Sequence, residues 1–163
     1  MMGRIYQINV KPRTRGARGL PKVPVDSVSI TTNGLEGDFN VYRHGELDDD
    51  PDSAVLLMPL ETLEELNREG WPIKPGDIGE NVTTTGIPYD EFAPGRRFTL
   101  GSAEVQVSRA CDPCDNLFLL PCVGRERGPG FLKAMLGRRG WYARVTREGR
   151  VSKGDAMTPS YRT

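Results

Sequence analysis

The sequence predicts a single domain that is mainly β, with a few short helices. Its 163 residues are enough for one hydrophobic core, so we expect one domain that spans residues 1–163. Nineteen glycines and thirteen prolines lie between short apolar runs and not in one tract. This distribution is typical of many short strands joined by turns, and it argues against a disordered chain.

Composition and charge exclude several classes of function. The formal net charge is +0, whereas a general nucleic-acid binder would carry a basic surplus. No apolar segment approaches the roughly 20 residues of a membrane helix, and the N-terminus has no apolar stretch of signal-peptide length. Three cysteines, an odd number, fit reduced thiols in a cytosol better than a disulfide framework. We therefore expect a cytoplasmic protein that binds neither nucleic acid nor membranes.

In the first third of the chain, period-two patterns predict strands over residues 3–10 and 23–30. The basic segment 11–22 between them is predicted to be a loop, and Asn33-Gly34 is a strong turn signal. The acidic run 48–52 is predicted to be a solvated loop, with a site for a hard cation as the alternative.

The middle of the chain carries the clearest helix. Residues 54–58 form a continuous apolar run, which predicts a buried strand. Pro59 suits the first helical position, leucines follow at helical spacing, and Gly70 marks a stop. We expect this helix to plug a sheet.

The second half returns to strands. Residues 92–100 and 103–107 predict a hairpin that leads directly to the cysteine-rich segment. Apolar residues over 131–136 have the spacing of a second short helix, and 141–145 reads as a strand.

The cysteines give the first chemical signal. Cys111 and Cys114 form a C-x-x-C pair with Pro113 between them, and a regular strand cannot continue through this proline in a sheet interior. A thiolate is both a nucleophile and a ligand for soft metals, although inert packing is the usual role of a buried cysteine. Cys122 lies in an apolar setting, which favours packing.

Two further stretches carry polar groups suited to a site. In the segment 75–86, Glu80 and Asn81 follow Gly79 and supply a carboxylate and an amide at one spot; a turn with a threonine-rich strand is the alternative. His44 is the only histidine, and its side chain titrates near neutrality. It is either a proton donor or a residue that holds a loop by hydrogen bonds.

Several stretches together resemble the MOSC domain, named after the C-terminal part of molybdenum-cofactor sulfurase. The likeness is greatest to small stand-alone bacterial members of the YiiM type, and the stretches occur in the family's order over nearly the whole chain. They are Gly34–Asp38, Arg43–Gly45, Ala54–Leu57, Pro75–Thr84, Gly95–Gly101, Pro113–Cys114 and Gly140–Val145 with Gly149 and Gly154-Asp155.

The resemblance implies a strongly curved, barrel-like and mostly antiparallel sheet. It also implies a molybdopterin-type molybdenum cofactor, or sulfur carried on a cysteine, and some members reduce N-hydroxylated compounds such as amidoximes. An association with pyridoxal phosphate exists only at the level of the family. The family's cysteine corresponds to Cys114, its Glu-Asn pair to Glu80 and Asn81 with Thr83 in the same motif, and its histidine to His44. The chain departs from the common pattern at Cys111, at Ser53 and in the acidic run, which is longer than usual.

The leading hypothesis is a molybdenum-cofactor site that acts as an oxidoreductase on a small-molecule substrate. Cys114 would be the molybdenum ligand, His44 the proton donor, and an electron-donor protein the partner. Guanidinium groups match phosphate oxygens, so arginines are the candidates for the cofactor's phosphate. These candidates are Arg43, Arg109, Arg138, Arg139 and Arg144.

Three alternatives stay open. In sulfur transfer, Cys114 would carry a persulfide from a sulfur-donor protein and Cys111 would resolve it. A non-enzymatic domain could instead hold a structural zinc of the Cys₃His type through Cys111, Cys114, Cys122 and His44. A thioredoxin-like dithiol is disfavoured, because residues 115–121 are too short and too apolar for the helix that this motif opens.

Overall fold

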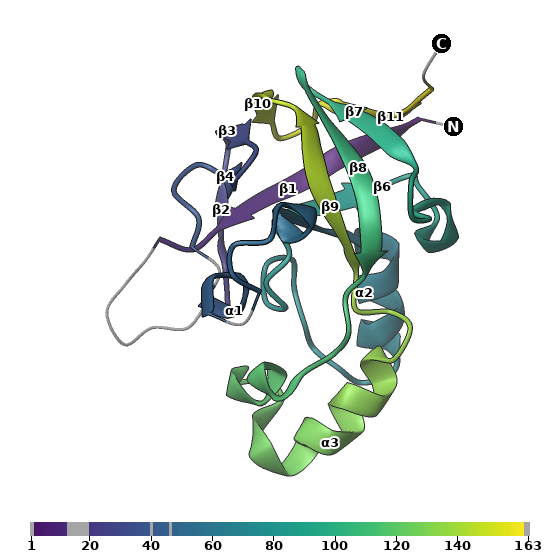
Figure 1. Cartoon of the computed structure of the whole chain (residues 1–163). Helices are drawn as coiled ribbons and strands as arrows, with labels where there is room; N and C mark the ends of the chain where they lie inside the picture. Colours follow the sequence, from purple (N-terminus) through teal and green to yellow (C-terminus); the bar gives the residue numbers. More distant parts are fainter. Residues whose placement is uncertain (1, 13–19, 40, 46, 162–163) are drawn as a thin grey trace.

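The computed structural model describes residues 2–12, 20–39, 41–45 and 47–161 (Figure 1). Its strands are β1 (Gly3–Val10), β2 (Val23–Val25), β3 (Ser27–Thr31), β4 (Gly34–Leu35), β5 (Val55–Pro59), β6 (Val82–Thr85), β7 (Arg97–Leu100), β8 (Ala103–Ala110), β9 (Trp141–Arg147), β10 (Gly149–Ser152) and β11 (Ala156–Ser160). Its helices are α1 (Val41–Gly45), α2 (Leu60–Arg68) and α3 (Gly124–Met135), with single 3₁₀ turns η1 (Pro51–Ser53), η2 (Tyr89–Glu91) and η3 (Asp115–Leu119).

The main sheet closes into a barrel. Its strands run in the order β11-β7-β8-β9-β5-β6-β1, and β1 pairs with β11 to complete the ring. Neighbouring strands are antiparallel except β5 and β6, which are parallel. The predicted barrel-like, mostly antiparallel sheet is therefore confirmed. Strand β2 lies beside β1, and β10, β3 and β4 form a separate small sheet.

Two hydrophobic cores explain the pattern of the strands. In β8, buried side chains alternate with half-buried ones, as expected for a strand with one face in a core. Strand β5 is buried at every position, because Leu57 belongs to the barrel core and its neighbour Met58 to a second core. A strand that is covered on both faces reads as a continuous apolar run.

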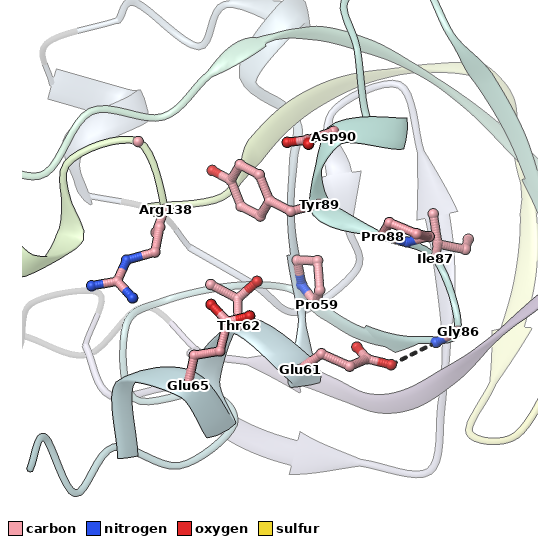
Figure 2. A pocket seen from close by; sticks show the side chains of 11 residues that line it. Pro59, Glu61, Thr62, Glu65, Gly86, Ile87, Pro88, Tyr89, Asp90 and Arg138 are labelled. Atoms are coloured by element: carbon pink, nitrogen blue, oxygen red, sulfur yellow. Dashed lines mark hydrogen bonds between the residues drawn. The ribbon is translucent and has the colours of Figure 1, made fainter. Parts of the chain in front are cut away.

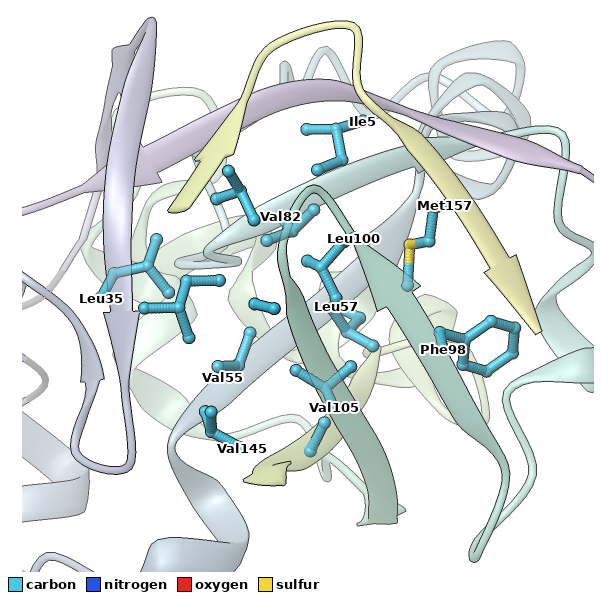
Figure 3. Close-up of a cluster of buried hydrophobic side chains, with 14 of the residues drawn as sticks. Ile5, Leu35, Val55, Leu57, Val82, Phe98, Leu100, Val105, Val145 and Met157 are labelled. Carbon is cyan, nitrogen blue, oxygen red and sulfur yellow. The ribbon is translucent and has the colours of Figure 1, made fainter. Parts of the chain in front are cut away.

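The barrel core fills the interior of the closed sheet, with Ile5, Val82, Phe98 and Val105 among its members (Figure 3). The second core joins α2 and α3, which lie together at one end of the barrel (Figure 1). Leu63 and Leu66 of α2 and Phe131 and Met135 of α3 belong to this second core. The helix that we expected to plug a sheet thus shares its apolar face with α3.

Three boundaries differ from the sequence prediction. The strand predicted over 23–30 divides at Asp26, because β2 pairs with β1 whereas β3 pairs with β10. Strand β8 continues to Ala110, because its pairing with β9 resumes after a register shift between Val107 and Arg109. Helix α3 begins at Gly124, well before the predicted 131. Residues 13–19 of the predicted basic loop lie outside the described residues.

Within the described ranges, no helix is long and apolar enough to cross a membrane.

Candidate functional site

The predicted Glu-Asn pair lies in the interior of the protein. Glu80 is fully buried; its Oε1 accepts a hydrogen bond from the Gly76 amide at 2.9 Å and its Oε2 from the Thr83 hydroxyl at 3.0 Å. Burial raises the pKa of Glu80 to about 7, although these hydrogen bonds and the charge of Arg139 oppose the rise. The carboxyl group therefore titrates near neutrality.

Asn81 binds the start of β5 with its backbone and its side chain. Its amide donates to the Leu56 carbonyl at 2.8 Å, and its Oδ1 accepts from the Leu56 amide at 3.0 Å. Its Nδ2 donates to Asp38 Oδ2 at 2.9 Å. Asn9, also buried, donates to the Glu80 carbonyl and to the Thr83 hydroxyl. The Glu80 side chain thus binds residues within the 75–84 segment, whereas Asn81 joins this segment to β5 and to Asp38.

A buried ion pair completes this cluster. Lys22 Nζ lies 2.6 Å from Asp38 Oδ2, and both side chains are almost fully covered. Burial lowers the pKa of Lys22, and the Asp38 carboxylate opposes that change. Sequence reasoning missed Lys22, which is one of several cations in a basic segment. Asp38 is part of the Gly34–Asp38 motif, which was the available signal.

Among the predicted phosphate ligands, Arg139 is the one whose guanidinium has buried, unpaired N–H donors in the described structure. It is only 6% exposed, and its Nε and Nη1 atoms are buried without a hydrogen-bond partner. Its charge acts on Glu80 and on Lys22, so it belongs to the same cluster. Burial of an unpaired ion lowers the stability of the fold by an amount on the order of several kcal/mol. An anionic ligand would remove that cost.

Two other candidate arginines are occupied by neighbours. Arg43 is buried and donates to the carbonyls of Asn33, Asp49 and Asp50 at 2.8–2.9 Å. Arg138 donates Nη2 to Glu69 Oε1 at 2.8 Å, and this pairing raises the pKa of Arg138.

The acidic run forms a surface loop and the η1 turn, as the prediction of a solvated loop requires, and three of its carboxylates contact basic side chains. Asp49 accepts from His44 Nδ1 at 3.0 Å, Asp50 pairs with Arg109 at 3.3 Å, and Asp52 faces Arg144 at 3.6 Å. Each carboxylate thus meets a different predicted site residue. The alternative of a hard-cation site finds no support in the described residues, where no group of three acidic, histidine or cysteine side chains is gathered.

All three cysteines are free thiols. Cys111 is buried, and Cys114 is half-buried in the extended connection between β8 and η3. Cys122 lies against the second core, where burial raises the pKa of its thiol. The predicted Cys₃His zinc site is wrong, because the described residues, which include all four ligands, gather no such set.

Gly140 links the buried arginine to the cysteine segment. Its carbonyl accepts from the Cys111 amide at 2.9 Å, and Arg139 is the preceding residue. Gly140 has φ +106°, and a Cβ there would lie 2.7 Å from the Leu57 carbonyl oxygen. Only glycine fits this close approach. The backbone at 139–140 thus ties Arg139 to the segment that leads to Cys114.

A pocket of about 650 Å³ adjoins the same backbone (Figure 2). Tyr89 is part of its wall, and the Tyr89 hydroxyl accepts from the Gly140 amide at 3.0 Å. The other walls come from the start of α2, where Glu61 holds the Gly86 amide, and from Arg138 (Figure 2). Neither Cys111 nor Cys114 lines this pocket.

Known proteins resemble this chain in sequence and in fold. The uncharacterized protein YflK from Bacillus subtilis (strain 168) is 34% identical over 149 residues, which are 83% of this chain and 60% of the relative. The chain thus spans less than two thirds of that relative. The YuaD protein from Bacillus subtilis has a TM-score of 0.83 at 20% identity, with 99% of this chain and 98% of that chain covered, and this likeness concerns the fold alone.

YiiM from Geobacillus stearothermophilus has a TM-score of 0.73 at 30% identity, with 98% of this chain and 76% of that chain covered. YiiM from Escherichia coli has a TM-score of 0.69 at 25% identity, with 98% and 71% covered. The model of the MOSC domain family matches residues 42–158, which is most of the sequence and includes the Glu-Asn pair, Cys114 and Arg139. The chain therefore belongs to the MOSC domain family.

Proposed function

We propose that this protein binds a molybdopterin-type molybdenum cofactor through Cys114 and reduces N-hydroxylated compounds such as amidoximes. Arg139 is the observation that carries the proposal, because its buried Nε and Nη1 donors lack a partner in the described structure. A phosphate group is one of the anions whose oxygens match the fork of a guanidinium. Family membership supplies the identity of the cofactor.

The donor set fits the cofactor at both ends. Arg139 would hold the phosphate, and the thiolate of the half-buried Cys114 would be the soft ligand that molybdenum favours. When bound, the cofactor would supply the two-electron chemistry. Electrons would come from an electron-donor protein, and the second substrate would be a small molecule.

The remaining predicted residues would shape the site without holding the phosphate. Arg43, Arg109 and Arg138 already bind carbonyl or carboxylate oxygens. Arg144 faces Asp52 at 3.6 Å. Glu80 would keep the 75–84 segment in place through its hydrogen bonds with Gly76 and Thr83, and Asn81 would do so through its bond with Leu56. We therefore assign the phosphate to Arg139 alone among the five arginines.

The first experiment is elemental analysis with pterin fluorescence on protein from a host that makes the cofactor. Wild type should contain molybdenum and pterin, Cys114→Ser should lose molybdenum, and Arg139→Gln should lose both. Matched controls are Cys122→Ser, a half-buried thiol of the second core, and Arg138→Gln, whose guanidinium is bound by Glu69. Wild-type protein that contains neither metal nor pterin contradicts the proposal.

A second candidate is a sulfur carrier, and the pair of free thiols favours it. Cys114 is half-buried and Cys111, three residues earlier, is buried. Cys114 would hold a persulfide and Cys111 would resolve it. Intact mass after treatment with a sulfur donor tests this function: added sulfur on wild type and on Cys111→Ser, but not on Cys114→Ser, supports it. No added sulfur on wild type refutes it.

A further inference from the structure

The only histidine of the chain is held by a carboxylate. Nδ1 of His44 lies 3.0 Å from Asp49 Oδ2 and 3.2 Å from Asp49 Oδ1. The centroids of the Phe39 ring and the imidazole are 5.2 Å apart. A carboxylate accepts hydrogen bonds only, so it favours the tautomer with the proton on Nδ1. The Nε2 atom of neutral His44 then carries no proton and can accept one from a bound molecule.

The backbone of Asp49 is built to hold this geometry. Its φ is +53°, in the left-handed region that non-glycine residues seldom adopt. Its amide donates to the Arg43 carbonyl at 3.0 Å, and its own carbonyl accepts from Arg43 Nη2 at 2.9 Å. Arg43 is buried and precedes His44 directly. Arg43 thus fixes the turn at Asp49, and His44 is the residue that follows Arg43 in α1.

Contacts of its neighbours link His44 to both parts of the candidate site. Asp50, the residue after its partner Asp49, pairs with Arg109 of β8, the strand that leads to Cys111 and Cys114. Phe39, which precedes α1, contacts the His44 ring. The residue before Phe39 is Asp38, which binds Lys22 and Asn81. Short chains of contacts therefore connect His44 to the cysteine segment and to the buried cluster.

We propose that Asp49 is a positioning residue that makes His44 the proton donor of this site, an inference that rests on the proposed function. Reduction of an amidoxime takes two electrons and two protons, breaks the N–O bond, and yields an amidine and water. Protonated His44 gives its Nε2 proton to the departing oxygen, which leaves as water. The nitrogen takes its proton from solvent, and both electrons come from the electron-donor protein. His44 regains its proton from solvent after each turnover.

Nuclear magnetic resonance of the cofactor-free protein tests the pairing. With one histidine in the chain, ¹⁵N shifts of the imidazole in alkaline buffer report a single tautomer equilibrium. Wild type should carry the proton mainly on Nδ1, and Asp49→Asn should move it mainly to Nε2. Asparagine tolerates the left-handed φ, so the turn should survive. The matched control is Asp48→Asn, which removes the same charge at the neighbouring left-handed residue and should leave the tautomer unchanged.

Kinetics of the cofactor-loaded protein test the role, with benzamidoxime as the probe and reduced methyl viologen as the electron source. His44→Ala should lower kcat by about 10²-fold with little change in KM, as for loss of a general acid. Asp49→Asn should lower kcat by about 10-fold, less than the ~10²-fold or more expected for loss of the general acid itself, because His44 is still present. Asp48→Asn should match wild type.

Unchanged tautomers in Asp49→Asn, or a kcat for His44→Ala near that of an active wild type, overturn the inference and leave the proposed function standing. Loaded wild type that does not reduce benzamidoxime overturns the proposed function and the proton-donor role together. The tautomer measurement still reports the Asp49–His44 pairing in that case, so the two failures are distinguishable.

Discussion

Replacement of Arg139 by methionine should stabilise the cofactor-free protein. The substitution keeps an unbranched side chain of similar length and removes a buried charge whose Nε and Nη1 lack partners in the described structure. The effective cost of an unpaired buried ion is about several kcal/mol, and attraction to the partly ionised Glu80 offsets some of it. We therefore expect the free energy of unfolding to rise by about 1–3 kcal/mol, the range seen when buried charges are replaced by apolar groups.

The size of this gain should depend on pH. Below pH 6 Glu80 is mostly neutral, because its pKa is about 7, so Arg139 lacks a counter-charge and the gain should be largest. At pH 8.5 the ionised Glu80 offsets part of the cost, and the gain should shrink. Urea denaturation at both pH values measures the difference, because the midpoint moves with stability while the slope stays constant.

Arg138→Met is the matched control, because its guanidinium is bound by Glu69 at the surface. We expect a loss of about 0–1 kcal/mol there, as for surface ion pairs. If Arg139→Met loses stability at both pH values, Arg139 is paired in the folded protein, and the argument for an anion site fails. The same variant should lose the cofactor, so stability and binding should change in opposite directions.

Three further predictions concern the groups that build the site. In wild type, the contribution of Glu80 to stability should be greatest below about pH 4.5, its ordinary pKa, and should be lost as the pH rises to about 7; Glu80→Gln should remove this dependence. Thermal melts of both proteins from pH 4 to pH 9 measure it. Melting temperatures that change with pH in the same way in both proteins would contradict the assignment. Gly140→Ala should lower the free energy of unfolding by about 2–4 kcal/mol, because φ is +106° and the new Cβ would meet the Leu57 carbonyl. Urea denaturation measures this loss. A midpoint equal to that of wild type would show that the backbone shifts to accommodate the Cβ. Arg43→Lys should lower the free energy of unfolding by about 2–4 kcal/mol, because one ammonium cannot reach the three carbonyls that the guanidinium fork binds. Chemical denaturation measures this loss. The control Arg144→Lys should change the free energy of unfolding by less than about 1 kcal/mol.

The sequence was most informative where one local rule decides the structure. A period-two pattern located β1, strand-like runs bounded by turn residues located the β7–β8 hairpin, and the Pro59-to-Gly70 pattern located α2. The division at Asp26 could not be predicted, because β2 and β3 join different sheets and that choice depends on β1 and β10. The end of β8 was equally inaccessible, since its last residues are strand only through pairing with β9.

The site was predictable in its residue types and not in its pairing. Glu80, Asn81 and Cys114 stood out by motif, but nothing local separates Arg139 from its neighbour Arg138. Arg138 meets Glu69 of the α2 C-terminus, while Arg139 turns inward toward Glu80. Such sorting depends on contacts between segments far apart in the sequence. For the same reason the partners of the acidic run could not be predicted, because they come from α1, β8 and β9.

A net charge of zero is compatible with a site for an anion because the charges are sorted in space. Asp50 of the acidic run pairs with Arg109 near the end of β8, and Asp38 neutralises the buried Lys22. The charge of Arg139, in contrast, has no fully ionised partner, because Glu80 is only half ionised near neutrality. Long-range attraction is weak in a neutral protein, whereas a single desolvated guanidinium acts strongly at short range. In the proposed function, such a site would select a ligand that brings its anion into the interior over anions that stay at the surface.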